Sequence, residues 1–294
     1  MLAGYTVERP DLFRVRANTD RSARLAFGDL VEPYDRGRPV VPAGYAEAAL
    51  QRLRSGAPHR QLEVGAGTGQ LTAALTRLGP TVALEPSPAM AARLRHNLAS
   101  EVAAGRLQVW ERSFESLAPG DGLFDCIWSA DTWHWLEPAV AYPLAAGLLT
   151  TSGLLINTWR FPALADAGLS GALNDVYKEL SPNLVRDEAA QFSLEDPLFA
   201  EGRDEVERRG AMTVVDSWLD ERTVKVPRDR YLDWQLSYAH IAYLTAEQRQ
   251  GLRDAVSGVL AQRGLKQVEV RLSHYTVASA KSPTAAHPYP ALSE

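Results

Sequence analysis

The chain has 294 residues, of which 46% are hydrophobic and 23% charged, and its formal net charge is −5. This composition is typical of a globular protein long enough for one large domain or two small ones. The acidic balance disfavours a nucleic-acid partner, because proteins that grip nucleic-acid phosphates usually carry a basic surplus. The single cysteine, Cys126, excludes an internal disulfide and a cysteine-based zinc site, and we predict no metal.

The N-terminus, MLAGYTVERPDLF, lacks a basic start followed by an apolar core, so no signal peptide is predicted. The longest charge-free run covers residues 138–159, and Pro143 and the turn residues 150–153 divide it into a helix and a strand. We therefore expect no membrane span and a cytoplasmic location. The oligomeric state stays open.

Residues 1–42 contain four prolines and are expected to form an irregular N-terminal cap or lid. A helix is predicted over residues 43–53. Short apolar strands then alternate with helices. The predicted strands are residues 61–64, 81–84, 107–110, 124–128 and 154–158, and the predicted helices between them are residues 70–78, 88–103 and 139–149. This alternation indicates right-handed crossovers and a parallel sheet buried on both faces.

The alternation stops after Trp159. Residues 160–207 are predicted to be a helical, loop-rich insertion over the sheet, without a strong strand. Residues 211–226 are predicted to be extended, residues 228–243 and 246–263 helical, and residues 267–280 a strand. The core should therefore span residues 43–281, and residues 282–294 are expected to be a flexible tail.

The strongest chemical signal is LEVGAGTGQLT, residues 62–72, where a strand ends and a helix is expected to open near Gly69. Gly65, Gly67 and Gly69 allow positive φ and let a ligand approach with no β-carbon in the way. Parallel sheets bind ligands at this end of their strands. The spacing G-x-G-x-G disfavours an NAD-linked oxidoreductase, because the third glycine of a dinucleotide loop would fall at Gln70.

Two carboxylates accompany the loop. Glu85 closes the second strand in VALEP, where it could accept two hydrogen bonds from the ribose hydroxyls of an adenosine group. Glu63 lies inside the first strand and is predicted either to accept from an ammonium group or to buttress the loop.

The pattern E-x-G-x-G-x-G followed by an acid at the end of the next strand resembles the class I S-adenosylmethionine-dependent methyltransferases. SFESL (113–117) is similar to the family segment that flanks the adenine, and FDCIWSADTWHWLEP (124–138) to its fourth-strand motif. YDRGRPVVP (34–42) resembles the N-terminal stretch of the trans-aconitate methyltransferase-like group. The resemblance covers residues 34–159 and departs in residues 160–207, so it supplies no substrate.

The resemblance implies an α/β, Rossmann-like, doubly wound sheet of seven mostly parallel strands with an antiparallel last strand, plus a helical cap or insertion. It implies S-adenosyl-L-methionine as cofactor and S-adenosyl-L-homocysteine as product. The residues predicted to bind the cofactor are Tyr34, Arg38, Glu63, Gly65, Gly67, Gly69, Glu85, Ser113, Phe114, Glu115 and Ala130. Tyr34 would close over the cofactor, and Arg38 would either pair with its carboxylate or help hold the lid.

The stretch Asp131-Thr132-Trp133-His134-Trp135 falls just past the fourth strand, at the ligand-binding edge. Aromatic walls there suit a sulfonium cation and a flat acceptor. His134, and as a second candidate Asp131, could take a proton from the acceptor. Acceptor contacts are predicted for Trp133, Trp135, Trp159 and Tyr238. One of the two tryptophans in the stretch is expected to pack beneath the sheet while the other lines the cavity.

These observations predict methyl transfer to a small organic acceptor, through an O, N or C nucleophile, in a biosynthetic role. Catalysis would depend mainly on alignment of the reacting atoms. The insertion, residues 160–207, would form part of the acceptor pocket. Two alternatives stay open: a regulator that binds the cofactor without transfer, and a non-methylating enzyme on the same scaffold.

Overall fold

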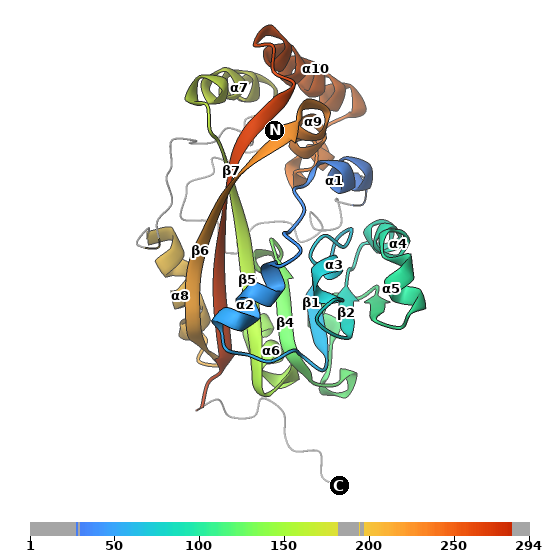
Figure 1. The fold of residues 1–294 in the computed structure, drawn as a ribbon, viewed down its shortest axis with the longest axis vertical. Helices are drawn as coiled ribbons and strands as arrows, with labels where there is room; N and C mark the ends of the chain where they lie inside the picture. Colours follow the sequence, from blue (N-terminus) through green and yellow to red (C-terminus); the bar gives the residue numbers. More distant parts are fainter. Residues whose placement is uncertain (1–27, 29, 182–193, 195–196, 284–294) are drawn as a thin grey trace.

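The computed structural model describes residues 28, 30–181, 194 and 197–283. They build one seven-stranded sheet in the order β3-β2-β1-β4-β5-β7-β6 (Figure 1). The strands are β1 Gln61–Val64, β2 Thr81–Leu84, β3 Leu107–Trp110, β4 Phe124–Ala130, β5 Leu149–Leu164, β6 Met212–Pro227 and β7 Gln267–Lys281. Only β7 runs antiparallel to its neighbours, β5 and β6. The predicted fold class is confirmed.

Helices cover both faces of the sheet. The α-helices are α1 Val31–Gly37, α2 Tyr45–Arg52, α3 Thr72–Leu75, α4 Pro88–Asn97, α5 Ala99–Ala103, α6 Pro138–Leu148, α7 Ala167–Leu180, α8 Pro197–Arg208, α9 Arg228–Gln235 and α10 Ala246–Gln262. Short 3-10 turns are η4 Phe114–Ser116, η5 Pro119–Asp121, η6 Trp133–Trp135 and η8 Ala239–Tyr243. The α2 side chains pack on one face of β4 and β5, and the α6 side chains on the other.

A further apolar core lies beyond the sheet. The strands β5, β6 and β7 are 15 or 16 residues long and continue past the short strands β1–β3 as a twisted ribbon (Figure 1). Side chains of α7, α9 and α10 pack on the far end of this ribbon. The molecule therefore has a sheet core and a second core at the end of the ribbon.

Two differences from the predicted elements concern the start of helices. Residues 31–37 form a helix although Pro33 was expected to break it, because proline is tolerated in the first helical turn, where N–H groups have no intrahelical acceptor. Helix α3 begins at Thr72 and not near Gly69, so turns connect the glycine loop to it.

Three further boundaries differ. The predicted helix 88–103 is interrupted at Leu98, whose φ of −117° is not helical. The predicted helix 228–243 ends at Gln235, so Trp234 and Tyr238 do not share a helical face. Strand β5 continues to Leu164, so residues 160–164 belong to the sheet and not to an insertion. This extension of β5 is paired with β7, from Arg160 opposite His274 to Leu164 opposite Val270.

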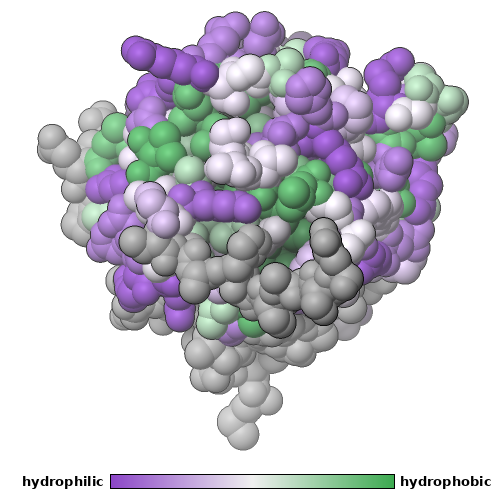
Figure 2. Space-filling model, turned by 90° about the horizontal axis from the view of Figure 1, so that it is seen from below, coloured by the Kyte–Doolittle hydropathy of each residue, from purple (hydrophilic) through white to green (hydrophobic). Residues whose placement is uncertain are grey.

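Much of the predicted lid (residues 1–27 and 29), the middle of the predicted insertion (182–193, 195–196) and the tail from residue 284 lie outside the described residues. Within the described part, no helix has the length and apolar character to cross a bilayer. Figure 2 shows the molecule from below, where hydrophilic and hydrophobic side chains are interspersed on the coloured part of the surface.

Candidate active site

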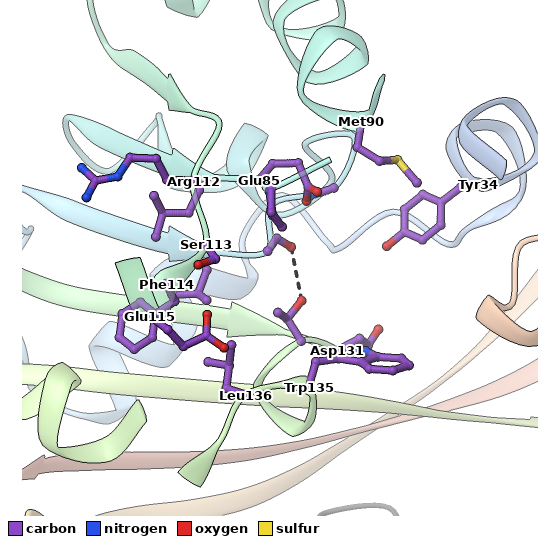
Figure 3. Close-up of a pocket in the computed structure, with 16 residues that line it drawn as sticks. Tyr34, Glu85, Met90, Arg112, Ser113, Phe114, Glu115, Asp131, Trp135 and Leu136 are labelled. Carbon is purple, nitrogen blue, oxygen red and sulfur yellow. Dashed lines mark hydrogen bonds between the residues drawn. The ribbon is translucent and has the colours of Figure 1, made fainter. Parts of the chain in front are cut away.

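A cleft opens at the carboxyl ends of β1, β2 and β4 (Figure 3). The empty space within it, including the part open to solvent, is about 680 Å³. The lining residues are Tyr34, Val64, Gly65, Gly67, Leu84, Glu85, Pro86, Met90, Arg112, Ser113, Phe114, Glu115, Asp131, Thr132, Trp135 and Leu136. This set brings together most of the residues that the sequence predicts for the cofactor.

The glycine loop shapes one wall of the cleft. Gly65, Gly67 and Gly69 have φ angles of +70°, +57° and +95°. A β-carbon on Gly65 would collide with the Thr132 side chain, while one on Gly67 would lie 3.5 Å from the Tyr34 ring. Gly69 does not line the cleft, and its missing β-carbon leaves room for Leu94 of α4. Gly69 therefore serves helix packing.

Glu85 lines the cleft from the end of β2. Its Oε2 accepts a hydrogen bond from the Gly67 N–H at 2.8 Å, and its Oε1 from the Ser87 N–H at 2.9 Å. Burial raises the pKa of this carboxyl group, and the two backbone hydrogen bonds oppose that rise. Because each carboxylate oxygen has two acceptor positions, the oriented group retains capacity for two hydroxyl donors from a ligand.

The cleft continues along β3 and η4. Ser113, Phe114 and Glu115 all line it, as predicted from SFESL. Phe114 is buried and packs against Trp133 with ring centroids 5.5 Å apart, so the ring is held in place from behind. Seven further lining residues were not predicted from the sequence: Val64, Leu84, Pro86, Met90, Arg112, Thr132 and Leu136. Six of these flank or lie inside the quoted motifs, but Met90 belongs to α4 and had no such signal.

Tyr34 closes the cleft from α1, with its ring over Gly67. Arg38 lies over the Tyr34 ring at 5.1 Å and over the Tyr238 ring at 4.6 Å. Its Nε donates to Ser237 Oγ at 2.8 Å and its Nη2 to the Ser237 carbonyl at 3.1 Å. Neither Arg38 nor Tyr238 lines the cleft. Arg38 was predicted either to pair with the cofactor carboxylate or to help hold the lid. Its described contacts, with Tyr34, Ser237 and Tyr238, match the second role.

Three arginines also fasten the segment that follows α1, here called the strap (Arg38–Val40). Arg230 donates to the carbonyl of Arg38 at 3.0 Å, Arg160 to that of Pro39 at 2.7 Å, and Arg222 to that of Val40 at 3.0 Å. The donors come from α9, β5 and β6. The strap thus connects α1, and with it Tyr34, to the second half of the sheet.

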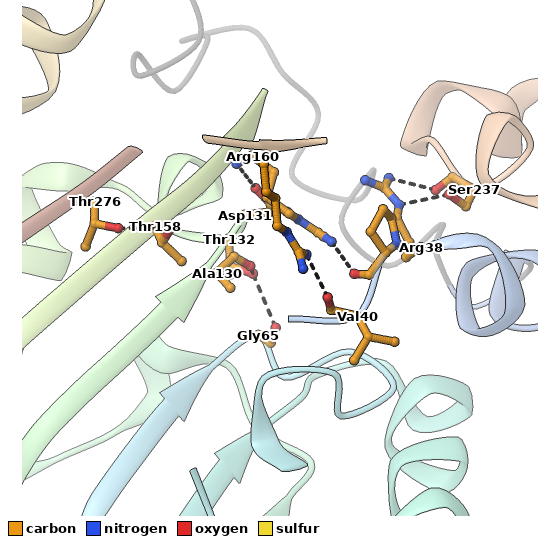
Figure 4. Close-up of polar contacts among 12 residues, drawn as sticks. Arg38, Val40, Gly65, Ala130, Asp131, Thr132, Thr158, Arg160, Ser237 and Thr276 are labelled. Carbon is orange, nitrogen blue, oxygen red and sulfur yellow. Dashed lines mark hydrogen bonds and ion pairs between the residues drawn. The ribbon is translucent and has the colours of Figure 1, made fainter. Parts of the chain in front are cut away.

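Asp131 lies at the floor of the cleft and is paired with Arg160 (Figure 4). Its carboxylate accepts from Arg160 Nε at 2.6 Å and from the Arg160 backbone N–H at 2.8 Å. Burial disfavours the charged form, but the Arg160 charge and these bonds outweigh it, so the pKa of Asp131 is lowered. A carboxylate held in this way is a weak proton acceptor, which favours a positioning role.

The WHW stretch forms the turn η6 and divides its side chains between two places. Trp133 is buried between Phe114 and Tyr142, whereas Trp135 lines the cleft. Trp133 is therefore the tryptophan of this stretch that packs in the core. It does not line the cleft, so the predicted contact between Trp133 and the acceptor finds no support there. His134 lines a separate small cavity instead of the cleft.

That second cavity lies beside α6 and α8 and is lined by Trp133, His134, Pro138, Tyr142, Trp159, Gly202 and Glu205. Trp159 is buried there and stacks on Tyr275 with centroids 6.1 Å apart. Successive residues of a strand point to opposite faces, so Trp159 points away from its neighbour Arg160. The predicted proton transfer by His134 and acceptor contact by Trp159 therefore find no support in the cleft.

Two further predicted residues lie behind the cleft. Glu63 is buried, accepts a hydrogen bond from Thr72 Oγ1 at 2.5 Å, and burial raises its pKa to about 8. This bond joins β1 to the first residue of α3, a contact that matches the second of its two predicted roles, the buttressing of the loop between them. Ala130 ends β4 and does not line the cleft, but its carbonyl accepts from Thr132 Oγ1 at 3.2 Å.

Among the described residues, no group of three or more His, Cys, Asp or Glu side chains is arranged to hold a metal ion.

Comparison with known families gives a match over residues 62–157, to a family described as "Methyltransferase domain". Curated relatives include uncharacterized methyltransferases of Mycobacterium tuberculosis H37Rv and Mycobacterium bovis, each 36% identical over 141 residues. That alignment covers 48% of this chain and 54% of each relative. The chain therefore spans about half the length of the curated relatives it matches.

Solved structures share the architecture at low sequence identity. A candidate type II methyltransferase from Anaeromyxobacter dehalogenans superposes with a TM-score of 0.53 at 16% identity, over 83% of this chain and 97% of that one. The protein YjhP from E. coli gives a TM-score of 0.50 at 14% identity, over 87% and 99%. Such likeness establishes the fold alone. The match over residues 62–157 to a methyltransferase domain agrees with the family predicted from the motifs; the trans-aconitate methyltransferase-like group stays a prediction.

Proposed function

We propose that the chain binds S-adenosylmethionine and transfers its methyl group to a small organic acceptor, because residues 62–157 match a methyltransferase domain and carry the motifs that resemble the class I S-adenosylmethionine-dependent methyltransferases. The single observation that carries this proposal is the cleft between the glycine loop and Tyr34, with the Glu85 carboxylate inside it. The cleft combines bare backbone, an oriented acceptor of hydroxyl hydrogen bonds and an apolar wall.

The residues present fit such a cofactor. Glu85 would hold the ribose hydroxyls, the backbone at Gly65 and Gly67 would face the amino-acid part, and Phe114 and its neighbours would flank the adenine. The bound cofactor would supply an electrophilic methyl group with a good leaving group. Tyr34 covers the loop and, with Trp135, would exclude water from the reacting atoms.

Transfer in this site would depend on alignment. Holding a nucleophile in line with the transferred carbon contributes roughly 7–11 kcal/mol in well-oriented model reactions. The described cleft offers Asp131, whose lowered pKa makes it a weak base, and it does not offer His134. We therefore infer an acceptor that needs little help with proton removal. The small-molecule acceptor, the biosynthetic role and the cytoplasmic location belong to this proposal.

Calorimetry with S-adenosylmethionine and S-adenosylhomocysteine tests cofactor binding. In the variant Glu85→Gln, an amide group replaces one carboxylate acceptor, so affinity for both nucleosides should fall at least about tenfold. Glu179→Gln, at an exposed position on α7, is the matched control and should bind as the wild type does. No binding by the wild-type chain would overturn the proposal.

Mass spectrometry of reactions with phenols, acids and amines then tests transfer. A methylated product supports the enzyme. Tight nucleoside binding without product from any acceptor class would favour the regulator or the non-methylating enzyme instead.

A further inference from the structure

A polar row crosses the second half of the sheet, next to the cleft. Arg160 of β5 is paired with His274 of β7, which is paired with Asp220 of β6. Residues directly opposite on neighbouring strands point to the same face, with β-carbons about 5 Å apart. Arg222 lies two residues further along β6 than Asp220, and therefore on the same face. The pairing of β5, β7 and β6 thus places the guanidinium groups of Arg160 and Arg222 and the imidazole of His274 on one face of the sheet.

Two polar nitrogens in this row are buried without a hydrogen-bond partner among the described residues: His274 Nε2 and Arg222 Nε. His274 is only 4% exposed. Burial and the charges of Arg160 and Arg222 lower its pKa to about 4, so it is neutral and can present an N–H donor at Nε2. Buried donors left unpaired are costly, so this pair is suited to an acceptor supplied by a ligand.

The carboxylates of the chain near this row are already engaged. Asp131 is held by Arg160. Asp220 is exposed and accepts from the Trp218 indole at 2.9 Å. Neither contacts the unpaired nitrogens of His274 or Arg222 in the described structure. Because neither described carboxylate fills this place, we infer that a ligand supplies the missing acceptor.

The row is continuous with the cleft but distant from the cofactor loop. Asp131 lines the cleft and bonds Arg160, which begins the row (Figure 4). With neighbouring strands about 4.8 Å apart, β7 lies about 14 Å from β1 across the order β1-β4-β5-β7. An anion bound at His274 and Arg222 would thus lie on the far side of Asp131 from the glycine loop, where an acceptor would be placed.

We propose that Arg222 and His274, supported by Arg160, bind a carboxylate of the methyl acceptor, so that the acceptor is a small organic acid. This inference rests on the proposed function. A guanidinium and a neutral N–H donor side by side match the two oxygens of a carboxylate. The cofactor also carries a carboxylate, and the experiment separates the two sources.

The test uses the full chain saturated with S-adenosylhomocysteine. The probes are benzoate, salicylate, succinate and glutarate, each beside its neutral primary amide, and binding is followed by saturation-transfer NMR and calorimetry. We expect at least one acid to bind at least about tenfold more tightly than its amide. Its binding should also raise the pKa of His274 from about 4, measured by NMR.

The variants Arg222→Gln and His274→Gln should each weaken acid binding about tenfold, and His274→Gln should leave the affinity for S-adenosylhomocysteine within about twofold. Arg222 also holds the strap at Val40, so a loss of binding in Arg222→Gln could come from the strap. No strap contact is described for His274, so His274→Gln tests the acid site separately. Arg52→Gln removes an exposed arginine paired with Asp216 and should change neither affinity. Thermal unfolding verifies that each variant is folded.

Three results overturn the inference: no acid binds, the amides bind equally well, or the variants bind acids as the wild type does. An equal loss of nucleoside and acid affinity in His274→Gln also overturns it, because the anion would then belong to the cofactor. If the wild-type chain binds no nucleoside, the proposed function fails. Comparison of acids with amides in the nucleoside-free chain then still decides whether the anion site exists.

Discussion

The two halves of the sheet place their functional side chains by different means. In β1–β4 the strands are four to seven residues long, and most residues that line the cleft stand at strand ends or in the loops that follow. In β5–β7 the strands are 15 or 16 residues long, and Arg160 and His274 lie within the strands. The first half is assembled from local sequence motifs, whereas the second is assembled by register between distant segments.

The largest effect is expected where the halves meet. Replacement of Arg160 by methionine would leave the Asp131 carboxylate without its cation, at side-chain exposures of 10% and 22%. Removal of one partner of a buried pair costs about 3–5 kcal/mol, to be measured as the free energy of unfolding in urea. In the control Arg52→Met, the broken pair is exposed and the cost should stay below about 1 kcal/mol. Equal losses in both variants would mean that Arg160 does not join the halves.

A smaller effect on stability, with a larger one on binding, is expected inside the first half. Gly65→Ala places a β-carbon at φ +70° and against Thr132. Gly105→Ala is a matched control, because Gly105 also has φ +70° but a β-carbon there would meet no atom within 4 Å. Each should lose about 1–2 kcal/mol of stability from backbone strain, and Gly65→Ala should lose more than Gly105→Ala because Thr132 must shift. Only Gly65→Ala should weaken nucleoside binding at least about tenfold in calorimetry; unchanged affinity would contradict the role given to the bare backbone.

The smallest effect near neutral pH is expected at Glu63, behind the loop. Burial raises its pKa from 4.5 to about 8, so between these values the folded chain holds a proton that the unfolded chain releases. This contribution to stability is full below pH 4.5 and is lost as the pH rises through about 8. Glu63→Gln should flatten the pH dependence of urea unfolding between pH 4.5 and about 8, relative to Glu179→Gln. Parallel profiles for the two variants would count against a buried, protonated Glu63.

The same contrast explains what the sequence could predict. Gly65, Gly67, Glu85 and the SFESL segment could be placed because each follows directly from a strand end, and strand ends of a parallel sheet meet at one edge. The extension of β5 could not be predicted, because its partners on β7 lie more than 100 positions away in the sequence. Periodicity identifies a strand but does not reveal its register.

Side-chain direction set a second limit. Trp159 and Arg160 are neighbours, and the prominent aromatic residue was predicted to face the acceptor. Alternation along β5 sends Trp159 to the α6 and α8 side and Arg160 to Asp131. In the same way, the turn η6 separates Trp135 from His134. Composition showed which residues could react, but not which face they occupy.

The strap has a consequence for how the sequence of this segment can vary over evolution. Its three arginine contacts reach main-chain oxygens, and the Val40 side chain is 55% exposed. Recognition of the main chain does not depend on which amino acid supplies the carbonyl. Homologues could therefore diversify position 40 while the path of the chain, and so the placement of Tyr34, is inherited unchanged.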